Sequence, residues 1–551
     1  MCFFCVFFLR SVNIYNRYYL RYKAERDFWG NSDCRGSNHN VNIQIFSEIN
    51  KFWAYFFAFG GCFSGKRAEN GADGRGVTQN IVSLRPMKAF RIYKDYYKEN
   101  LRLAFPVILS QIGQITVQLA DTAMVGRYGG DDPTPMAAVA FATNLFYIVF
   151  ITSIGITFGL TPLVGERYAQ NRHRHVRELL QNGILLFSLL GVVATLLLVG
   201  LKGMFPVMAS LMLGDGGDSS ISSVVDMAIP YYNTLIWSLF PVMIWGTIKQ
   251  FLEGIGNTRV AMVTIITANA VNILLNWVFI FGKCGVEPMG ALGAGYATLI
   301  SRILQCVMML AYFFTTPKFR TYTENLLSRS MIKFRRIAEI LKVGIPISFH
   351  MLMESSAFVV AGIMVLAFGA SSVSAYQIGV NMMSVTFMII IAIGSSTTIL
   401  CSHIYGSKDF PRLRHTVNAA YQMGLLWNIT VASLYVAFRY HIPALFTTNE
   451  EVIQITASML IFISLFQVSD CLQAISISIM RGLQDVKVLM PIVFVSYVVI
   501  NIPVGYLLAF ECGLKTNGLI IGFIVGLSCC AVMTIRRVRK DIKQLEMSVE
   551  N

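Results

Sequence analysis

The sequence predicts an all-α polytopic membrane protein with about twelve transmembrane helices in two six-helix lobes. Of its 551 residues, 55% are hydrophobic and only 14% are charged, whereas soluble domains carry about a quarter charged residues. Apolar runs of the roughly 20 residues that cross a bilayer follow one another along the chain. The second half of the chain also repeats features of the first half. Many short-looped helices therefore account for the length better than several soluble domains do.

Residues 1–86 differ from the rest of the chain. The opening MCFFCVFFLR is apolar but shorter than a spanning helix, and the residues after it show no periodicity. We interpret this extension as disordered or as wrongly predicted coding sequence, with Met87 as a credible true start. Phe52–Phe63 is a candidate interfacial segment. Cys2 and Cys5 form a lone CxxC without a second pair, so a metal site is not expected there.

Twelve apolar runs follow this extension, and we predict a span for each of them. In the first half the predicted spans are 101–126, 137–162, 179–201, 229–252, 260–282 and 290–314. In the second half they are 341–368, 374–400, 416–438, 453–480, 487–509 and 516–536. We therefore divide the chain into an N-lobe, residues 87–328, and a C-lobe, residues 329–551, which ends in a short cytoplasmic tail.

The charge of the loops alternates along the chain. Arginine and lysine gather before the first span, after the second and eighth spans, between the halves and after the last span, whereas the intervening loops are acidic or nearly neutral. Because basic loops face the cytoplasm, both termini are predicted to be cytoplasmic, as an even number of spans also requires. We expect a multi-pass protein of the plasma membrane, the bacterial inner membrane. This topology explains the formal net charge of +15, so no nucleic acid partner is expected.

The stretch 341–368 echoes the stretch 101–129. Pro106 and Gln114 correspond to Pro346 and Glu354, each pair 240 residues apart. Further matches join the halves: Asn144 with Asn381, EGIGNTRV from Glu253 with RGLQDVKV from Arg481, Asn276 with Asn501, and Gly293 with Gly518. Since each half holds six spans, the copies are parallel repeats about an axis along the membrane normal. This architecture fits a central cavity that opens alternately to each side, and it favours a transporter over a channel.

Three carboxylates inside the predicted spans are the strongest functional signals. Glu354 lies in the middle of the seventh span, Asp470 in the tenth and Asp121 late in the first. A charge at membrane depth costs at least about 2.5 kcal/mol and is functional by default in this setting. The copies differ in charge, because Ala361 corresponds to Asp121 and Ile244 corresponds to Asp470. We infer that the lobes have diverged in role, with one ionic set in each.

Other polar residues lie close to these carboxylates in the sequence. Asn272 and Asn276 are four residues apart on the fifth span, so both side chains share one helix face. They either bond neighbouring helices, which is common in membrane bundles, or join an ion site. His350 precedes Glu354 by one turn, where it either tunes the protonation of the carboxylate or bonds a second helix. A buried carboxylate can hold H⁺, Na⁺ or a cationic substrate, and an antiporter needs that competition.

Residues from about 87 to 540 resemble the multidrug and toxic compound extrusion (MATE) family. The resemblance rests on LADTAMVG in the first span, LNWVFIFG in the fifth, GAGYAT before the sixth and RGLQD after the tenth. The glutamate in the seventh span and the aspartate in the tenth are similar to those of the NorM-type branch. Asn276 agrees with this, because the DinF-type branch usually carries aspartate there. The resemblance implies export of organic cations and other drugs, driven by inward Na⁺ or H⁺, with no cofactor.

The same resemblance implies roles for particular residues. Glu354 and Asp470 would be the cation-coupling carboxylates of the C-lobe, with His350 and Gln114 in a tuning role. The N-lobe cation site, where Na⁺ could bind, would comprise Asp121, Asn272, Asn276 and Thr298. Phe466 departs from the pattern, because NorM-type proteins often have an aromatic hydroxyl near the ion there. Its loss disfavours direct Na⁺ coordination in the C-lobe and favours proton coupling.

Two alternative hypotheses remain. A lipid or polysaccharide-precursor flippase of related fold would need several Arg or Lys residues inside the spans to meet pyrophosphate, whereas we expect these spans to hold acids instead. A membrane-embedded enzyme would need a His/Asp or Ser/His constellation that the sequence does not show, so we expect no enzyme activity. The leading hypothesis is a monomeric secondary antiporter whose partners are small cationic or amphipathic molecules and membrane lipid. We also expect Lys249 and Glu253 to form a solvated pair at a cytoplasmic helix end.

Overall fold

The computed structural model describes residues 85–129, 134–205, 218–323 and 332–550, and the elements within these ranges are helices. Pro86–Asn551 forms one unit. The predictions for the N-terminal extension, including Phe52–Phe63 and the CxxC of Cys2 and Cys5, lie outside the described residues, although the first helix begins at Arg85. The all-α class that the composition predicts is confirmed.

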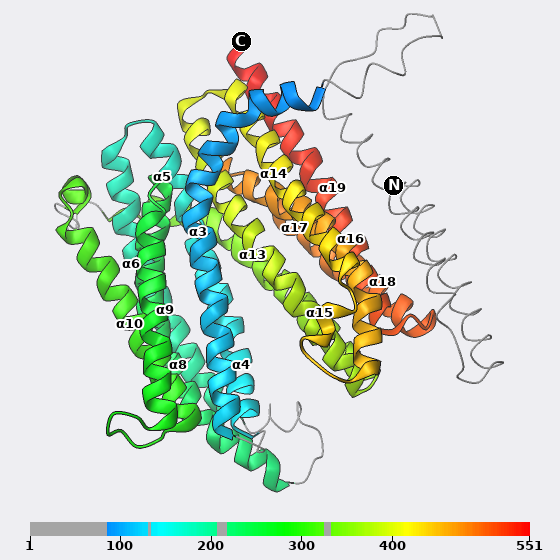
Figure 1. Ribbon diagram of the computed structural model, residues 1–551. Coiled ribbons are helices and arrows are strands. Elements are labelled where there is room, and N and C mark those ends of the chain that lie inside the picture. Colours follow the sequence, from blue (N-terminus) through cyan, green and yellow to red (C-terminus); the bar gives the residue numbers. More distant parts are fainter. Residues whose placement is uncertain (1–84, 130–133, 206–217, 324–331, 551) are drawn as a thin grey trace, which may run out of the picture. The chain divides into compact units, whose positions relative to one another are not determined.

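The first half of the chain contributes the helices drawn from blue to green in Figure 1. They are α3 (Arg85–Gly129), α4 (Thr134–Thr157), α5 (Leu160–Ala169), α6 (His173–Leu201), α8 (Asp218–Gly254), α9 (Arg259–Phe281) and α10 (Gly290–Thr315). Short turns of helix follow α6 and α10: Lys202–Met204, Pro317–Phe319 and α11 (Arg320–Thr323).

The second half contributes the helices drawn from green to red. They are α12 (Phe334–Leu366), α13 (Ala370–Ser407), α14 (Phe410–Ala437), α15 (His441–Ala444), α16 (Glu450–Gly482), α17 (Leu489–Phe494), α18 (Ile502–Tyr506) and α19 (Lys515–Glu550). Two stretches beside α18, Val495–Asn501 and Leu507–Glu511, wind with the wider π-helical turn. Such turns are rare and are frequent at functional sites.

Eleven helical segments among the described residues are long and apolar enough to cross a membrane, by length and composition. Two of these segments contain more than one element. One, Ala138–Ala169, contains α4 and α5, and the other, Leu489–Glu511, runs from α17 to the end of the second π-helical stretch. The predicted ninth span, 416–438, falls on α14, a helix of 28 residues that is not among these eleven segments. The predicted last span, 516–536, is only the first part of α19, which continues as helix to Glu550.

The buried side chains divide the molecule into two lobes. One apolar cluster contains residues of α3 to α11, and two further clusters contain residues of α12 to α19. The first turns of α12, with Ile340, Val343 and Ile347, belong to the cluster of the first half. With the predicted division at residues 328 and 329, these turns of α12 form a contact between the two lobes.

Close backbone contacts reproduce the internal repeat. A Cβ atom at Gly254 would lie 2.9 Å from the Thr161 carbonyl oxygen, and one at Gly482 would lie 2.8 Å from the Thr398 carbonyl oxygen. Thr398 is the repeat counterpart of Thr161, at the same spacing that relates Asn381 to Asn144. Two residues further on, Gly256 and Gln484 both adopt a left-handed conformation, with φ of +86° and +62°. Equivalent residues thus make equivalent turns and contacts in the two lobes.

Candidate functional site

The N-lobe contains a hydrogen-bonded chain that joins the predicted cation-site residues. Asn276 on α9 donates through Nδ2 to an Asp121 carboxylate oxygen on α3, and also to Asn272 Oδ1 at 3.0 Å. Asn272 Nδ2 lies 3.3 Å from Ser301 Oγ on α10, and Ser301 donates to the Thr298 carbonyl at 2.9 Å. The structure therefore brings Asp121, Asn272 and Asn276 together directly, and it links Thr298 through its main chain.

The side chains of this hydrogen-bonded set differ in how far they are buried. Asn272 and Asn276 are 3% and 0% exposed, whereas Asp121 is half-buried. The buried Asn276 Oδ1 has no hydrogen-bond partner among the described residues. Together with the Asp121 carboxylate it offers oxygen ligands of the kind that a hard cation prefers. No three His, Cys, Asp or Glu side chains gather into a metal-holding group in the described part of the chain.

The C-lobe contains a second polar cluster, between α12, α16 and the π-helical stretch Val495–Asn501. The Tyr497 hydroxyl lies 3.4 Å from Glu354 Oε1 and accepts from Gln473 Nε2 at 2.9 Å. The His350 ring lies 3.8 Å from the Glu354 carboxylate and 3.1 Å from Gln473 Nε2. Asp470, only 3% exposed, stands one turn before Gln473 on α16 and interacts electrostatically with Glu354. Asp470 is thus buried on the helix that carries Gln473, and Glu354, with a side chain 17% exposed, lies in the cluster itself.

Of the two interpretations of His350 that the sequence left open, the structure shows the hydrogen bond to a second helix, and the tuning of Glu354 stays a prediction. Its ring is near Glu354 on the same helix, and it also bridges α12 to Gln473 on α16. Gln114 does not share this environment: it is exposed on α3, two helical turns from Asp121. Phe466 is buried and packs against the rings of Phe358 and Phe523. The aromatic hydroxyl near the carboxylate comes instead from Tyr497, which the sequence analysis missed.

Cations on three of the spanning helices correct the expectation that the spans hold acids and no bases. Arg302 lies in the middle of α10, whereas Lys249 and Arg481 lie near the C-terminal ends of α8 and α16. Lys249 Nζ is 3.6 Å from Glu253, whose side chain is only 4% exposed, so this pair is buried and not solvated as predicted. Arg481 Nη2 lies 3.5 Å from His350 Nδ1 and interacts electrostatically with Glu354.

Each of these cations has a carboxylate as its electrostatic neighbour: Glu253 for Lys249, Asp121 for Arg302 and Glu354 for Arg481. Hydropathy and loop charge carry no sign of this pairing, because the partners of Arg302 and Arg481 lie on other helices. The one available signal in the sequence was the presence of arginine well inside an apolar run, which is rare in membrane helices.

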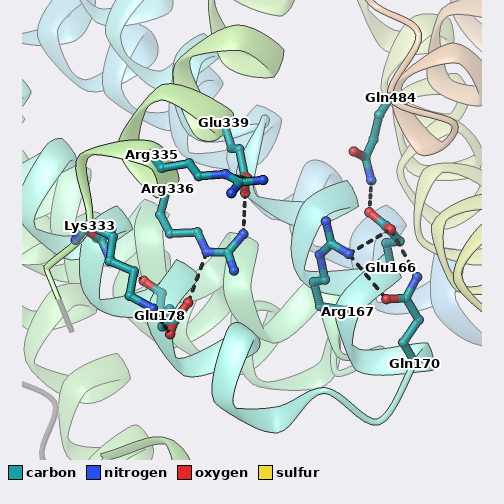
Figure 2. Close-up of polar contacts among 10 residues, drawn as sticks. Glu166, Arg167, Gln170, Glu178, Lys333, Arg335, Arg336, Glu339 and Gln484 are labelled. Atoms are coloured by element: carbon teal, nitrogen blue, oxygen red, sulfur yellow. Dashed lines mark hydrogen bonds and ion pairs between the residues drawn. The ribbon is translucent and has the colours of Figure 1, made fainter. Parts of the chain in front are cut away.

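Contacts between the lobes occur at the end predicted to be cytoplasmic, and Figure 2 shows two of them. Glu178 on α6, with a side chain 1% exposed, accepts from Lys333 Nζ at 2.5 Å and from Arg336 Nε at 3.1 Å. Both cations lie at the start of α12. Glu166 on α5 accepts from Gln484 Nε2 at 2.7 Å. These bonds tie α5 and α6 of the first lobe to segments of the second.

Two more contacts at this end join the lobes outside the view of Figure 2. His403 Nε2 on α13 lies 2.7 Å from the Gly254 carbonyl oxygen at the end of α8. The Ser396 hydroxyl on α13 donates to Asn100 Oδ1 on α3 at 2.6 Å. Four helices of the first lobe therefore share in the closure of this end.

Comparison with known proteins agrees with the repeat and the fold. The MatE family model matches residues 106–278 and 346–507, so its two matched segments begin at Pro106 and Pro346, the pair that defines the repeat. The multidrug resistance protein NorM of Photobacterium profundum is 27% identical over 472 residues, covering 83% of this chain and 99% of that protein. A probable multidrug resistance protein NorM of Halalkalibacterium halodurans is 28% identical over 462 residues, covering 84% and 98%.

Solved structures share the fold at lower sequence identity. A MOP superfamily transporter from Pyrococcus furiosus superposes with a TM-score of 0.73 at 22% identity, covering 83% of this chain and 98% of that one. An outward-facing multidrug resistance MATE family transporter superposes with a TM-score of 0.72 at 21% identity, covering 82% and 97%. The family model spans more than half of the sequence and both of its repeats. This chain therefore belongs to the MatE family of multi-pass membrane transporters.

Proposed function

We propose that this protein is a secondary antiporter of the plasma membrane that exports organic cations and other amphipathic drugs in exchange for inward H⁺. The observation that carries the proposal is the C-lobe cluster, in which Glu354 lies beside the Tyr497 hydroxyl and the His350 ring, while the buried Asp470 stands one turn from Gln473 of the same cluster. Family membership and the names of the relatives, multidrug resistance proteins, support drugs as the cargo. The loop charges support an orientation with both termini in the cytoplasm.

The chemistry of the C-lobe cluster favours H⁺ over Na⁺ as the coupling ion. Two carboxylates close together repel one another when both are ionised, and a proton or an organic cation relieves that repulsion. The groups near Glu354 include the Tyr497 hydroxyl, the His350 ring and the guanidinium of Arg481, which lies beside His350. Na⁺ prefers several oxygen acceptors, and a nearby guanidinium opposes it.

The hydrogen-bonded residues of the N-lobe, Asp121, Asn272 and Asn276, are the alternative binding site for Na⁺. Its support is the unpartnered Asn276 Oδ1 beside the Asp121 carboxylate. The electrostatic contact of Arg302 with Asp121 acts against a second cation there. Proton coupling through Glu354 and Asp470 is therefore the stronger proposal.

The intramembrane cations favour one second candidate, a flippase for anionic lipid-linked precursors. Lys249, Arg302 and Arg481 supply the positive charges that pyrophosphate would need. Each already has a carboxylate neighbour, however, so each pair is electrically neutral when both members are charged. Neutral pairs attract a pyrophosphate less than free cations would, so cation export remains the leading proposal.

Ethidium uptake into inside-out vesicles tests this function, with a pH gradient or a Na⁺ gradient imposed separately. We expect uptake under the pH gradient alone and no uptake in vesicles that carry Asp470→Asn. Uptake driven by Na⁺ alone would indicate that the coupling ion binds at the hydrogen-bonded residues of the N-lobe, and not at Glu354 and Asp470. If neither gradient drives uptake and the protein instead translocates a lipid-linked pyrophosphate between leaflets, the flippase hypothesis replaces the antiporter.

A further inference from the structure

The first turns of α3 contact the second lobe, although later turns of the same helix belong to the apolar cluster of the first lobe. Arg412 Nη2 on α14 donates to Glu99 Oε1 on α3 at 2.5 Å. The Asn100 amide, only 1% exposed, accepts from Ser396 Oγ at 2.6 Å and donates to Thr397 Oγ1 at 3.1 Å, both on α13. These bonds attach the start of α3 to the opposite lobe at the end predicted to be cytoplasmic.

Aromatic contacts extend this attachment toward the beginning of α3. The His415 ring on α14 stacks with the Tyr96 ring, with centroids 5.4 Å apart and 28° between the ring planes. The Tyr93 ring, one turn earlier on α3, has its centroid 5.6 Å from that of His415. Residues 93–100, which we call the α3 strap, therefore reach from one lobe to the other through stacked rings as well as hydrogen bonds.

The start of α12 makes the reciprocal attachment, from the second lobe to the first. Lys333 and Arg336 both bind Glu178 on α6, whose side chain is buried. One turn after Arg336, Ile340 packs in the apolar cluster of the first lobe. Residues 333–340, which we call the α12 strap, therefore contact the first lobe as the α3 strap contacts the second.

The internal repeat relates the two straps residue by residue. The counterparts are Tyr93 with Lys333, Tyr96 with Arg336, Glu99 with Glu339, and His415 with Glu178. The first three pairs are 240 residues apart, like the repeat prolines, and the last pair is 237 residues apart, like Thr161 and Thr398. The turns before α6 and α14 agree with this register, because Asn171 and Lys408 are both left-handed, with φ of +56° and +60°.

The two straps differ in chemistry although they are equivalent in position. A carboxylate between two cations holds the α12 strap, whereas an imidazole beside two phenol rings occupies the same place at the α3 strap. The ion pair of Glu99 with Arg412 is 39% and 43% exposed, and exposed ion pairs contribute little. The buried bonds of Asn100 and the stacking of His415 therefore supply most of the attachment of the α3 strap.

We infer that the α3 strap is a second closure of the cytoplasmic end, and that this end opens only when both straps leave the opposite lobe. Gly165 and Ser402 are repeat counterparts that touch one another, so the axis relating the lobes passes through their contact and the straps lie on opposite sides of it. The α3 strap begins the helix that carries Asp121, and the α12 strap begins the helix that carries Glu354. The inference requires alternate opening of the lobes, as the proposed antiport does, but no particular cargo or ion.

The rate of maleimide labelling at residue 402 of a full chain with Ser402→Cys, located by tandem mass spectrometry, tests the inference in membrane vesicles. Asn100→Ala removes both hydrogen bonds from the α3 strap to α13. We expect labelling at least about fivefold faster in this variant, because closure loses two buried hydrogen bonds. Lys98→Gln is the matched control, since Lys98 is exposed on the same turn and makes no polar contact with the described residues of the second lobe. Its labelling should stay within about twofold of the parent rate.

A double variant tests whether opening releases both straps. Asn100→Ala weakens the α3 strap and Glu178→Gln weakens the α12 strap, at sites without a shared partner. If opening breaks both attachments, the double variant should accelerate labelling by about the product of the two single factors. A double variant that labels no faster than the faster single variant overturns the inference, and so does a folded Asn100→Ala variant that labels like Lys98→Gln.

Tyr96→Leu covers the case in which Asn100→Ala does not fold, as judged by gel filtration. It removes the stacking on His415 and keeps an apolar side chain, so labelling should be at least about threefold faster. Equal labelling of Tyr96→Leu and Lys98→Gln then overturns the inference.

Ethidium uptake in the same vesicles separates this inference from the proposed function. If the pH gradient drives no uptake in the parent chain while Asn100→Ala labels faster, the proposed function fails and the two straps stand. If the gradient drives uptake and Asn100→Ala labels like Lys98→Gln, the inference fails alone.

Discussion

The intramembrane carboxylates among the described residues differ in their neighbours. Lys249 lies 3.6 Å from Glu253, and Arg481 interacts electrostatically with Glu354. Asp470 differs, because the ionisable group that acts on it is another carboxylate, Glu354. Removing one partner of a buried ion pair costs about 3–5 kcal/mol, whereas neutralising one of two like charges relieves repulsion. Substitution of Asp470 should therefore affect transport more than stability.

We predict that Asp470→Asn abolishes drug export and leaves membrane insertion intact. The amide keeps the volume of the carboxylate but cannot exchange a proton or attract a cation. Asp485→Asn is the matched control, because Asp485 lies in the turn after the same helix and pairs with Arg537 at 2.6 Å outside the buried cluster. Drug resistance of cells at equal membrane abundance is the measurement. Normal resistance in Asp470→Asn would contradict the role given to this carboxylate.

At the scale of helices, close packing joins α4 of one lobe to α12 of the other. A Cβ atom at Gly155 would lie 2.8 Å from Ser348 Cα, and one at Gly159 would lie 2.6 Å from the Gly344 nitrogen. The Ser348 hydroxyl donates to the Thr152 carbonyl at 2.6 Å. Small residues at these positions allow the two backbones to touch, as is common between membrane helices. The break between α4 and α5 at Phe158-Gly159 falls inside this contact.

We predict that Gly344→Ala destabilises the protein, because its new methyl group would overlap the Ile156 carbonyl oxygen on α4. Overpacking of this kind typically costs about 1–3 kcal/mol. Gly362→Ala on the same helix is the control, since its methyl group would meet only Tyr376 Cε1, at 3.7 Å. A thermal melt of the detergent-solubilised chain compares the two variants. A melting temperature for Gly344→Ala equal to that of Gly362→Ala would show that α4 and α12 can move apart at this contact without loss of thermal stability.

At the scale of the whole molecule, hydrogen bonds and ion pairs close the lobes at the predicted cytoplasmic end. Glu178 with Lys333 and Arg336, and Glu166 with Gln484, are the contacts that Figure 2 shows. A transporter that opens alternately to the two sides must break these contacts once in each cycle. The strength of this closure therefore helps to determine how often the cytoplasmic side is open.

We predict that Glu178→Gln opens the cytoplasmic end more often. The neutral amide leaves Lys333 and Arg336 without their shared carboxylate, which weakens the closed state. Ser402→Cys reports the change, because Ser402 is fully buried against Gly165 of the other lobe. Maleimide labelling of this cysteine should be at least about tenfold faster in Glu178→Gln.

Glu339→Gln is the matched control for this labelling experiment. Glu339 binds Arg335 and Arg336 on its own helix and makes no lobe-to-lobe ion pair among the described residues. Labelling in this variant should stay near the rate of the parent chain. Equal labelling in Glu178→Gln and Glu339→Gln would mean that the Glu178 pairs do not hold the lobes together.

We also predict that a chain beginning at Met87 exports drugs as well as the full chain does. This start removes the extension and only the first two residues of α3, which begins at Arg85. Ethidium efflux from cells with equal amounts of the two proteins in the membrane is the measurement. Loss of insertion or of efflux in the shorter chain would assign a role to residues 1–86.

The amino-acid sequence by itself determines the helical class, the approximate limits of the spans and the internal repeat. These are local or periodic properties: a bilayer requires long apolar runs, and a duplicated segment keeps its spacing, as Pro106 with Pro346 and Gly254 with Gly482 show. The sequence also predicted the grouping of Asn272 with Asn276, because a spacing of four places both on one helix face. The bond from Asn276 to Asp121 joins α9 to α3, and only the resemblance predicted this grouping.

Only the tertiary structure decided which charges are partners. Arg302 on α10 bonds Ser238 on α8, and Arg481 on α16 lies 3.5 Å from His350 on α12. Tyr497 approaches Glu354 from a π-helical stretch, where each turn holds more residues than the α-helical period assumes. Such contacts depend on the distance and rotation between helices far apart in the chain. Hydropathy and periodicity describe one helix at a time, so they could not show these partners.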